Sequence, residues 1–186
     1  MKSKALFLLA IFACQGHAAV DFTPTQSTRE QDGIIFPQLF FKQDGQQISY
    51  EQPTGWKYRG DSSRIAFAPP NVAQAEAAIE QTPLPAPQNF DDPTVKLLKQ
   101  QVIDSVPKHS LHLEIASEEK NPLMPNGHET YEVVVAYQIS GIEFERSILF
   151  LNLPDTQLRF CVTAHKRDFE KIHNAFRASI FSWQWL

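Results

Sequence analysis

Two residues near the C-terminal end of the chain have the chemistry for nucleophilic catalysis. Cys161 and His165 stand four positions apart in an alternating stretch, residues 158–165, that is typical of a β-strand. A thiol beside a histidine base is the arrangement of a thiol-dependent enzyme. Along one strand, however, four residues separate the side chains by roughly 13 Å, at about 3.3 Å per residue, which is too far for a direct hydrogen bond. Each would need a partner from another strand, and we favour burial of Cys161 in the core.

Metal and hydrolase chemistry would require other patterns. His112, Glu114, His128, Glu129 and Glu132 carry ligand atoms in or near two expected neighbouring strands, but their spacing matches no common metal motif. The sequence lacks the Gly-x-Ser-x-Gly and His-Glu-x-x-His motifs, and its seven glycines form no phosphate-binding loop. We therefore expect no metal and no cofactor, and a solvated polar surface at these positions.

The chain ends in a group of aromatic residues, in which Trp183 and Trp185 follow Phe181. Such side chains either close the core or, if they are exposed, form a hydrophobic edge for a partner. We favour closure of the core. Trp183 and Trp185 are kept, together with Cys161 and His165, as the candidate binding residues.

The first 19 residues predict that the protein is exported. Two lysines precede an apolar stretch, residues 5–13, and small residues follow at the expected cleavage site, after Ala18 or Ala19. The apolar stretch is far shorter than the roughly 20 residues that span a bilayer, and no later segment approaches that length. We therefore expect a mature protein that is soluble and either periplasmic or secreted, without a transmembrane segment.

The two cysteines predict no disulfide, because Cys14 lies inside the segment that cleavage removes and leaves Cys161 alone. A second interpretation makes Cys14 a lipid-attachment site, since residues 11–14 loosely resemble the lipobox of bacterial lipoproteins. Phe12 is bulky for that motif, so ordinary cleavage is the interpretation that we favour.

The charge of the chain argues against nucleic acid as a partner. Cleavage removes Lys2 and Lys4 and no acidic residue, so the net charge changes from −4 to −6. A protein that neutralises a phosphate backbone needs clustered lysine and arginine side chains. The longest basic run is Lys166-Arg167, which is too short to form such a cluster.

The first half of the mature chain predicts a β-meander. Residues 20–33 are polar and show little periodicity, which predicts a flexible N-terminal segment. Asp44-Gly45, between apolar stretches, is a strong hairpin signal. Further strands are expected at residues 56–59 and 64–68, and residues 72–81 favour a strand only slightly over a helix.

The second half predicts two helices with strands between them. Asp92-Pro93 is a helix start, and apolar residues at helical spacing continue to Val106, before Pro107. Asp168 can cap a C-terminal helix with a regular apolar stripe. Four alternating stretches lie between the helices and are joined by short turns, which makes them antiparallel neighbours: residues 110–116, 129–139, 142–153 and 158–165.

Two parts of the sequence resemble PsbP-like domains, the PsbP/DcrB-type fold. Residues 48–56, Ile-Ser-Tyr-Glu-Gln-Pro-Thr-Gly-Trp, resemble the strand that runs into a Pro-x-Gly-Trp turn in that family. Residues 158–164 and 168–183 resemble its last strand and closing helix. The resemblance covers roughly residues 45–183. It implies an antiparallel sheet between helices and a non-enzymatic, accessory role, and it transfers no binding-site residue.

These observations predict an α+β fold: an antiparallel sheet of about six to eight strands flanked by helices, as a PsbP-like α/β/α sandwich. We expect a signal peptide at 1–19, the flexible segment at 20–33 and a single domain at 34–186. We interpret the protein as an exported, non-enzymatic accessory or binding protein of the cell envelope with a protein partner. A thiol-dependent enzyme using Cys161 and a small-ligand-binding protein stay open as alternatives.

Overall fold

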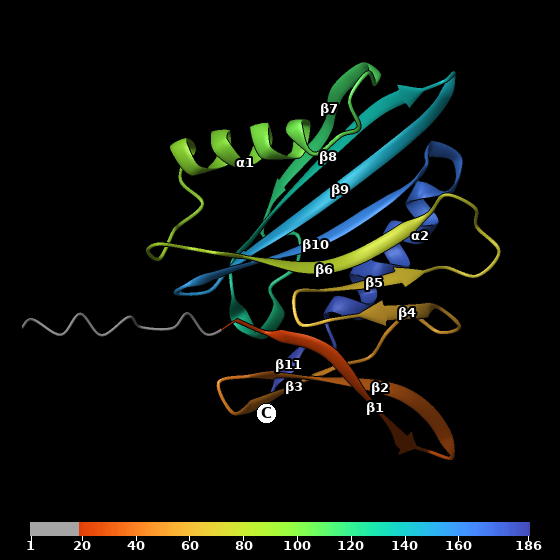
Figure 1. The fold of residues 1–186 in the computed structure, drawn as a ribbon, viewed down its shortest axis with the longest axis vertical. Helices are drawn as coiled ribbons and strands as arrows, with labels where there is room; N and C mark the ends of the chain where they lie inside the picture. The colour runs from red at the N-terminus through yellow and green to blue at the C-terminus, as the bar shows by residue number, and fades with distance from the viewer. Residues whose placement is uncertain (1–18) are drawn as a thin grey trace, which may run out of the picture.

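The computed structural model describes residues 19–186, so the predicted export signal, apart from Ala19, lies outside the described residues. The strands form two antiparallel sheets (Figure 1). The larger sheet has seven strands, in the spatial order β4 (Lys57–Gly60), β5 (Arg64–Ala68), β6 (Glu76–Pro83), β10 (Thr156–His165), β9 (Ile142–Asn152), β8 (Thr130–Ile139) and β7 (Leu111–Lys120). The smaller sheet has the order β1 (Asp21–Gln31), β2 (Ile34–Gln43), β3 (Gln46–Tyr50) and β11 (Gln184–Trp185).

Local turn chemistry forms the hairpins where the sequence predicts them. Asp44 and Gly45 both have positive φ, 50° and 77°, and join β2 to β3, because a tight hairpin turn requires this conformation at both positions. Ser140 and Gly141 join β8 to β9 in the same way. Of the expected strand at residues 72–81, the part from residue 76 onward is confirmed as β6, which pairs with both β5 and β10, whereas residues 72–75 form a turn.

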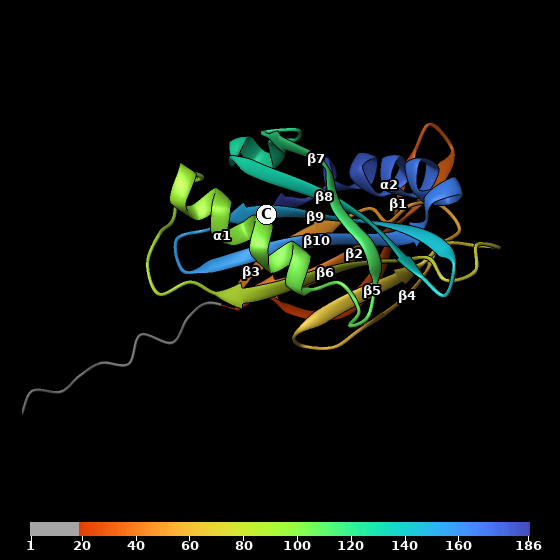
Figure 2. The same cartoon turned by 90° about the horizontal axis from the view of Figure 1, so that it is seen from above.

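Two helices cover opposite faces of the larger sheet, as Figure 2 shows. Helix α1 (Asp92–Asp104) begins after Asp91, whose carboxylate accepts a hydrogen bond from the Thr94 backbone N–H at 3.0 Å. Helix α2 (Lys166–Ile180) begins two residues before the expected cap at Asp168. A short 3-10 turn, η1 (Pro125–Gly127), lies between β7 and β8. The predicted fold class, an antiparallel sheet flanked by helices, is therefore confirmed.

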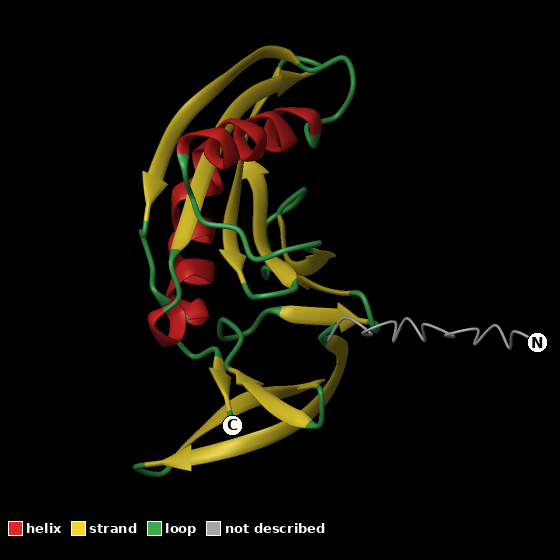
Figure 3. Ribbon diagram, turned by 90° about the vertical axis from the view of Figure 1, so that its left-hand side faces the viewer, coloured by secondary structure: helices red, strands yellow, loops and turns green. Residues whose placement is uncertain are grey.

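The expected flexible segment at residues 20–33 is wrong, because most of it forms strand β1, which pairs with β2 along its length. Val20 and Phe22 are fully buried, and the Val20 backbone exchanges two hydrogen bonds with the Gln81 side chain, at 2.8 and 2.7 Å. These apolar anchors order a segment whose other residues are mostly polar. Figure 3 shows the smaller sheet at one end of the molecule, beyond the larger sheet.

The two faces of the larger sheet have separate cores. The core beneath α1 includes Leu98, Val102 and Phe150. The core on the opposite face is larger, since it joins α2, the larger sheet and the smaller sheet through residues such as Phe176 and Phe41. The smaller sheet is therefore packed against the larger one rather than attached as a separate unit.

Candidate functional site

Helix α1 covers only part of its face of the larger sheet. In Figure 1 it lies on the β8 side of this face, while no helix lies in front of β4, β5 and β6. We call this uncovered surface the open face; it comprises the side chains of β4–β6 and of the adjoining part of β10 that point to the α1 side. Strand alternation decides which residues reach it, because successive side chains point to opposite faces.

The alternation in β5 and β6 places small and charged residues on the open face. Ile65 and Phe67 enter the core beneath α2, which leaves Arg64, Ala66 and Ala68 on the other side of β5. In β6, by the same rule, Glu76 and Glu80 point away from that core; Ala78 points to the same side but is buried in the core beneath α1. Alanine side chains fill little space, so a hollow of about 570 Å³ lies over β4 and β5. Its rim carries Lys57, Arg59, Asp61, Arg64 and Glu76.

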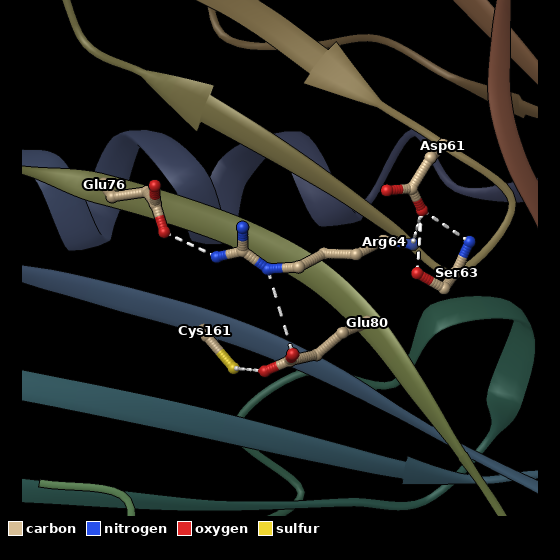
Figure 4. A network of polar contacts seen from close by, with 6 residues as sticks. All are labelled: Asp61, Ser63, Arg64, Glu76, Glu80 and Cys161. Carbon is tan, nitrogen blue, oxygen red and sulfur yellow. Dashed lines mark hydrogen bonds and ion pairs between the residues drawn. The ribbon is translucent and has the colours of Figure 1, made fainter.

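An ion-pair network fixes the centre of the open face (Figure 4). The Arg64 guanidinium donates to Glu76 through Nη2 at 2.5 Å, and its Nε lies 3.8 Å from Glu80 Oε2. Asp61 orders the preceding turn by accepting from the backbone N–H groups of Ser63 and Arg64, at 2.7 and 3.1 Å. The hydrogen bonds from Ser63 lower the pKa of the Asp61 carboxyl. The Arg64 side chain is thus held in place before any ligand arrives.

Cys161 lies at the inner edge of this network and is 5% exposed. Its thiol Sγ donates to Glu80 Oε1 at 3.2 Å (Figure 4). Burial, and then the negative charge of Glu80, raise the pKa of the Cys161 thiol well above its ordinary value. A thiol held in its protonated form is a poor nucleophile, because the thiolate is the reactive species.

His165 does not meet Cys161. Its Nε2 lies 2.6 Å from the Gln74 side-chain oxygen, and its ring packs edge-on against Phe144 with the ring centroids 4.7 Å apart. The thiol and the imidazole each have a different partner, brought by a different strand or loop. Cys161 and His165 therefore do not form the thiol and histidine-base pair of a thiol-dependent enzyme.

The two C-terminal tryptophans have different environments. Trp183 is 1% exposed and packs among aromatic rings of both sheets, so it closes the core, as favoured from the sequence, and does not form an exposed edge. Trp185 is partly exposed in β11, where its Nε1 donates to Gln43 Oε1 at 2.9 Å and its ring meets His128. A shallow hollow of about 370 Å³ adjoins Trp185.

A second polar cluster lies on the α2 face, around Glu132, which is 3% exposed. His173 Nε2 and Ser147 Oγ both lie 2.6 Å from Glu132 Oε1, and Arg177 Nη1 lies 3.4 Å from Oε2. Burial alone would raise the pKa of Glu132, but the hydrogen bond and charge of His173, with Ser147 and Arg177, lower it. The serine and the histidine both meet the carboxylate rather than each other, so this is not the order of a catalytic triad.

The Glu132 cluster forms the floor of a groove between β7 and α2 with a volume of about 330 Å³. Most of the charged side chains on its rim are acidic, and we call it the acidic groove. It is lined by Ala116, Ser117, Glu118, Glu119, Glu132, Val134, Glu145, Phe169, Glu170, His173 and Arg177. Burial raises the pKa of the Glu145 carboxyl, whose charge is also opposed by nearby Glu143.

Sequence reasoning did not identify Arg64, Glu80 or His173 as site residues. The signal for the open face is present in the alternation of β5 and β6, where charged and small residues share one face. The signal for the Glu132 cluster is weaker, because His173 lies 41 positions from Glu132 along the chain. The expected surface position of Glu132, as a member of a solvated polar face, is wrong.

Among residues 19–186, no group of three His, Cys, Asp or Glu side chains is arranged to hold a metal ion. The same described part of the chain contains no helix that is both long enough and apolar enough to cross a membrane.

No protein-family model matches the sequence, and no curated protein has significant similarity to it. Solved structures are similar in fold. One is LpqN of Mycobacterium tuberculosis, described as involved in cell envelope biogenesis, with a TM-score of 0.51, 13% identity and coverage of 89% of this chain and 92% of LpqN.

Two further similar structures have lower scores. The cyanobacterial PsbP of Synechocystis has a TM-score of 0.49 and 11% identity, with coverage of 95% of this chain and 99% of that protein. A Pseudomonas aeruginosa protein of unknown function, PA94, has a TM-score of 0.47 and 14% identity, with coverage of 84% and 94%. A PsbP is thus among the similar structures, as the sequence resemblance predicted. At these identities the similarity concerns the fold alone.

Proposed function

We propose that this protein is an exported, non-enzymatic accessory protein of the cell envelope that binds a partner through the open face. The observation that carries the proposal is the charged hollow over β4 and β5, whose central Arg64 is already held in position by Glu76. A preorganised charged group loses less conformational entropy on binding than a free one, so such a group favours recognition.

Two cations on the rim, which form no salt bridge with another residue of 19–186, support a binding role. Lys57 and Arg59 are exposed on the edge strand β4 and line the hollow beside Arg64. Arg64 is balanced by Glu76 and Glu80, which leaves Lys57 and Arg59 as the groups that can pair with acidic side chains of a partner. Charged groups at an interface contribute most to specificity and to the rate of association.

The reactive groups support binding rather than catalysis. The Cys161 thiol donates a hydrogen bond to Glu80, and the polar atoms of the Glu132 cluster are directed at one another. Each of these groups is thus engaged by an internal partner. The envelope location is supported by the export signal expected at residues 1–19 and by the shared fold with LpqN, which is involved in cell envelope biogenesis.

The proposal is tested by affinity capture of C-terminally tagged protein from its native host, followed by mass spectrometry. Three forms are compared: the unmodified chain, the double variant Lys57→Glu and Arg59→Glu, and a control with the same change of charge, Arg167→Glu and Lys171→Glu. The control pair lies exposed on α2, on the opposite side of the sheet. We expect a stoichiometric envelope protein that is retained by the control and lost from the β4 variant.

Two results would contradict this function. A partner retained equally by all three forms would show that binding does not use the open face, and recovery of the protein alone would argue against an accessory role. The same capture experiment with a Cys161→Ser variant tests the alternative of a thiol-dependent enzyme, because our proposal predicts that this variant captures the same partner. A ligand-binding protein would instead be stabilised against heating by a small molecule.

A further inference from the structure

Strand β7 presents a long free edge on the far side of the sheet from β4. Within the described chain it pairs only with β8, and all ten of its residues, Leu111–Lys120, are exposed. In Figure 1 it forms the upper edge of the larger sheet. An edge strand carries backbone N–H and C=O groups with no partner in the sheet, so another extended segment can pair with it.

Three exposed apolar side chains accompany this edge. Leu111, Leu113 and Ile115 are 59%, 38% and 40% exposed. Ile115 pairs with Val135, which belongs to the core beneath α1, and so it points to the α1 side of the sheet. Apolar side chains of a strand added beside β7 would extend this surface and remove Ile115 from water.

The other side of the edge is acidic. Glu119 pairs with Glu132 across the strands and points to the α2 side, where it lines the acidic groove with Glu145 and Glu170. Glu114 pairs with Ala136 and points to the same side. Glu114 and Glu119 thus lie on the α2 side of β7, and Ile115 lies on the α1 side. Glu118, which pairs with Val133, also points to the α1 side, where Tyr131 and Lys99 engage its carboxylate. A strand that alternates basic with apolar residues would match Glu119 on one side and Ile115 on the other.

The charge of the edge selects among occupants. A second copy of this chain would bring the glutamates of two β7 strands together, and like charges on directly opposed strands are destabilising. A basic partner meets no such repulsion.

We propose that β7 accepts an extended segment of a partner polypeptide as an added strand, and that this segment alternates apolar with lysine or arginine residues. The apolar side chains lie beside Ile115 on the α1 side, and the basic side chains reach Glu119 and Glu170 in the acidic groove. This surface is separate from the open face on β4–β6, so its test does not depend on the proposed function.

The test uses synthetic peptides with the whole mature protein. The probe is a blocked ten-residue peptide that alternates valine and lysine, and the controls are the same peptide with glutamate in place of lysine and with N-methylation of alternate backbone nitrogens. Binding is followed by fluorescence anisotropy. We expect binding by the lysine peptide alone, since N-methylation removes the donors of one strand edge without changing the charge.

Two further measurements locate the bound peptide. Hydrogen exchange of the backbone amides should slow in β7 on addition of the lysine peptide and should not change in β4, the other edge of the sheet. The double variant Glu119→Lys and Glu170→Lys should bind the peptide at least about tenfold more weakly. The control variant Glu30→Lys changes an exposed glutamate on β1 and should bind normally.

Equal binding of the lysine peptide and its N-methylated form would overturn the proposal, because it would show attraction of charges without strand pairing. Protection from exchange outside β7 would also overturn it. The peptide comparisons use one unmodified protein, so their outcome does not depend on whether a variant folds.

Discussion

Glu132 is a carboxylate that folding removes almost wholly from water, and its partners determine what its loss would cost. It is 3% exposed and meets His173, Ser147 and Arg177. We expect Glu132→Ala to lower the free energy of unfolding by about 3 kcal/mol or more, because it leaves these polar groups without their acceptor. Urea denaturation measures this change. Glu129→Ala, at an exposed position beside β8, is the control and should change the free energy of unfolding by less than about 0.5 kcal/mol. Equal effects of the two substitutions would contradict a stabilising role of the buried carboxylate.

The same carboxylate predicts a dependence of stability on pH. The pKa of Glu132 is lower in the folded protein than its ordinary value of 4.5. The stability that the ionised Glu132 contributes is therefore fully present above the pKa that this carboxyl has in the unfolded chain. It is lost as the pH falls through the lower pKa of Glu132 in the folded protein. As the pH is lowered from neutral into this acidic range, the urea concentration at the midpoint of unfolding should fall more steeply for the unmodified protein than for Glu132→Gln. Parallel pH profiles for the two proteins would refute this expectation.

Cys161 predicts an unreactive thiol. It is the one cysteine among the described residues, it is buried, and its pKa is raised by burial and by Glu80. We expect a disulfide reagent such as DTNB to modify the folded mature protein at least about a hundredfold more slowly than the protein in urea. A fast reaction of the folded protein would instead favour the thiol enzyme. Glu80→Gln, which removes the negative charge beside the thiol, is expected to speed the reaction less than unfolding does.

At the scale of the elements, Gly60 controls how closely β1 approaches β4. A Cβ atom at Gly60 would lie 2.6 Å from the Phe22 backbone oxygen and 3.2 Å from Ile65 Cβ. Gly60→Ala therefore forces β1 away or shifts the β4–β5 turn, and we expect a loss of about 1–3 kcal/mol of stability. Amide exchange should accelerate in β1. Ser62→Ala, at an exposed position in the same turn, is the control and should leave the rate of exchange unchanged. An unchanged exchange rate of the β1 amides in Gly60→Ala would show that contact with Gly60 does not hold this strand.

At the scale of the whole molecule, the core that joins the two sheets predicts cooperative unfolding. The Trp183 ring meets Phe22 and Phe41 of the smaller sheet and Phe160 of the larger one, at centroid distances of 6.4, 5.7 and 5.8 Å. In a variant with Trp56→Phe and Trp185→Phe, Trp183 reports on this junction alone. Its fluorescence and the far-UV circular dichroism should change at the same urea concentration. Loss of fluorescence at a lower concentration would mean that the smaller sheet detaches first.

Local signals in the sequence determined most of the elements. Asp44-Gly45 predicted the β2–β3 hairpin, and Asp92-Pro93 predicted the start of α1 to within one residue, since the cap is Asp91 rather than Asp92. Turns and helix ends depend on residues a few positions apart. Short turns likewise predicted the antiparallel order of β8, β9 and β10. Strand β1 was not predicted, because its own sequence is mostly polar and it is ordered by pairing with β2.

Tertiary structure alone decided the sites. The sequence placed Cys161 and His165 on one strand, but their partners, Glu80 and Gln74, come from positions 81 and 91 residues away. Glu132 and His173 likewise meet across 41 residues, and the open face exists because α1 packs on the β8 side of the sheet and leaves β4 and β5 uncovered. Alternation along a strand specifies the face to which a side chain points. The packing of distant elements decides whether that face is buried, paired or open to a partner.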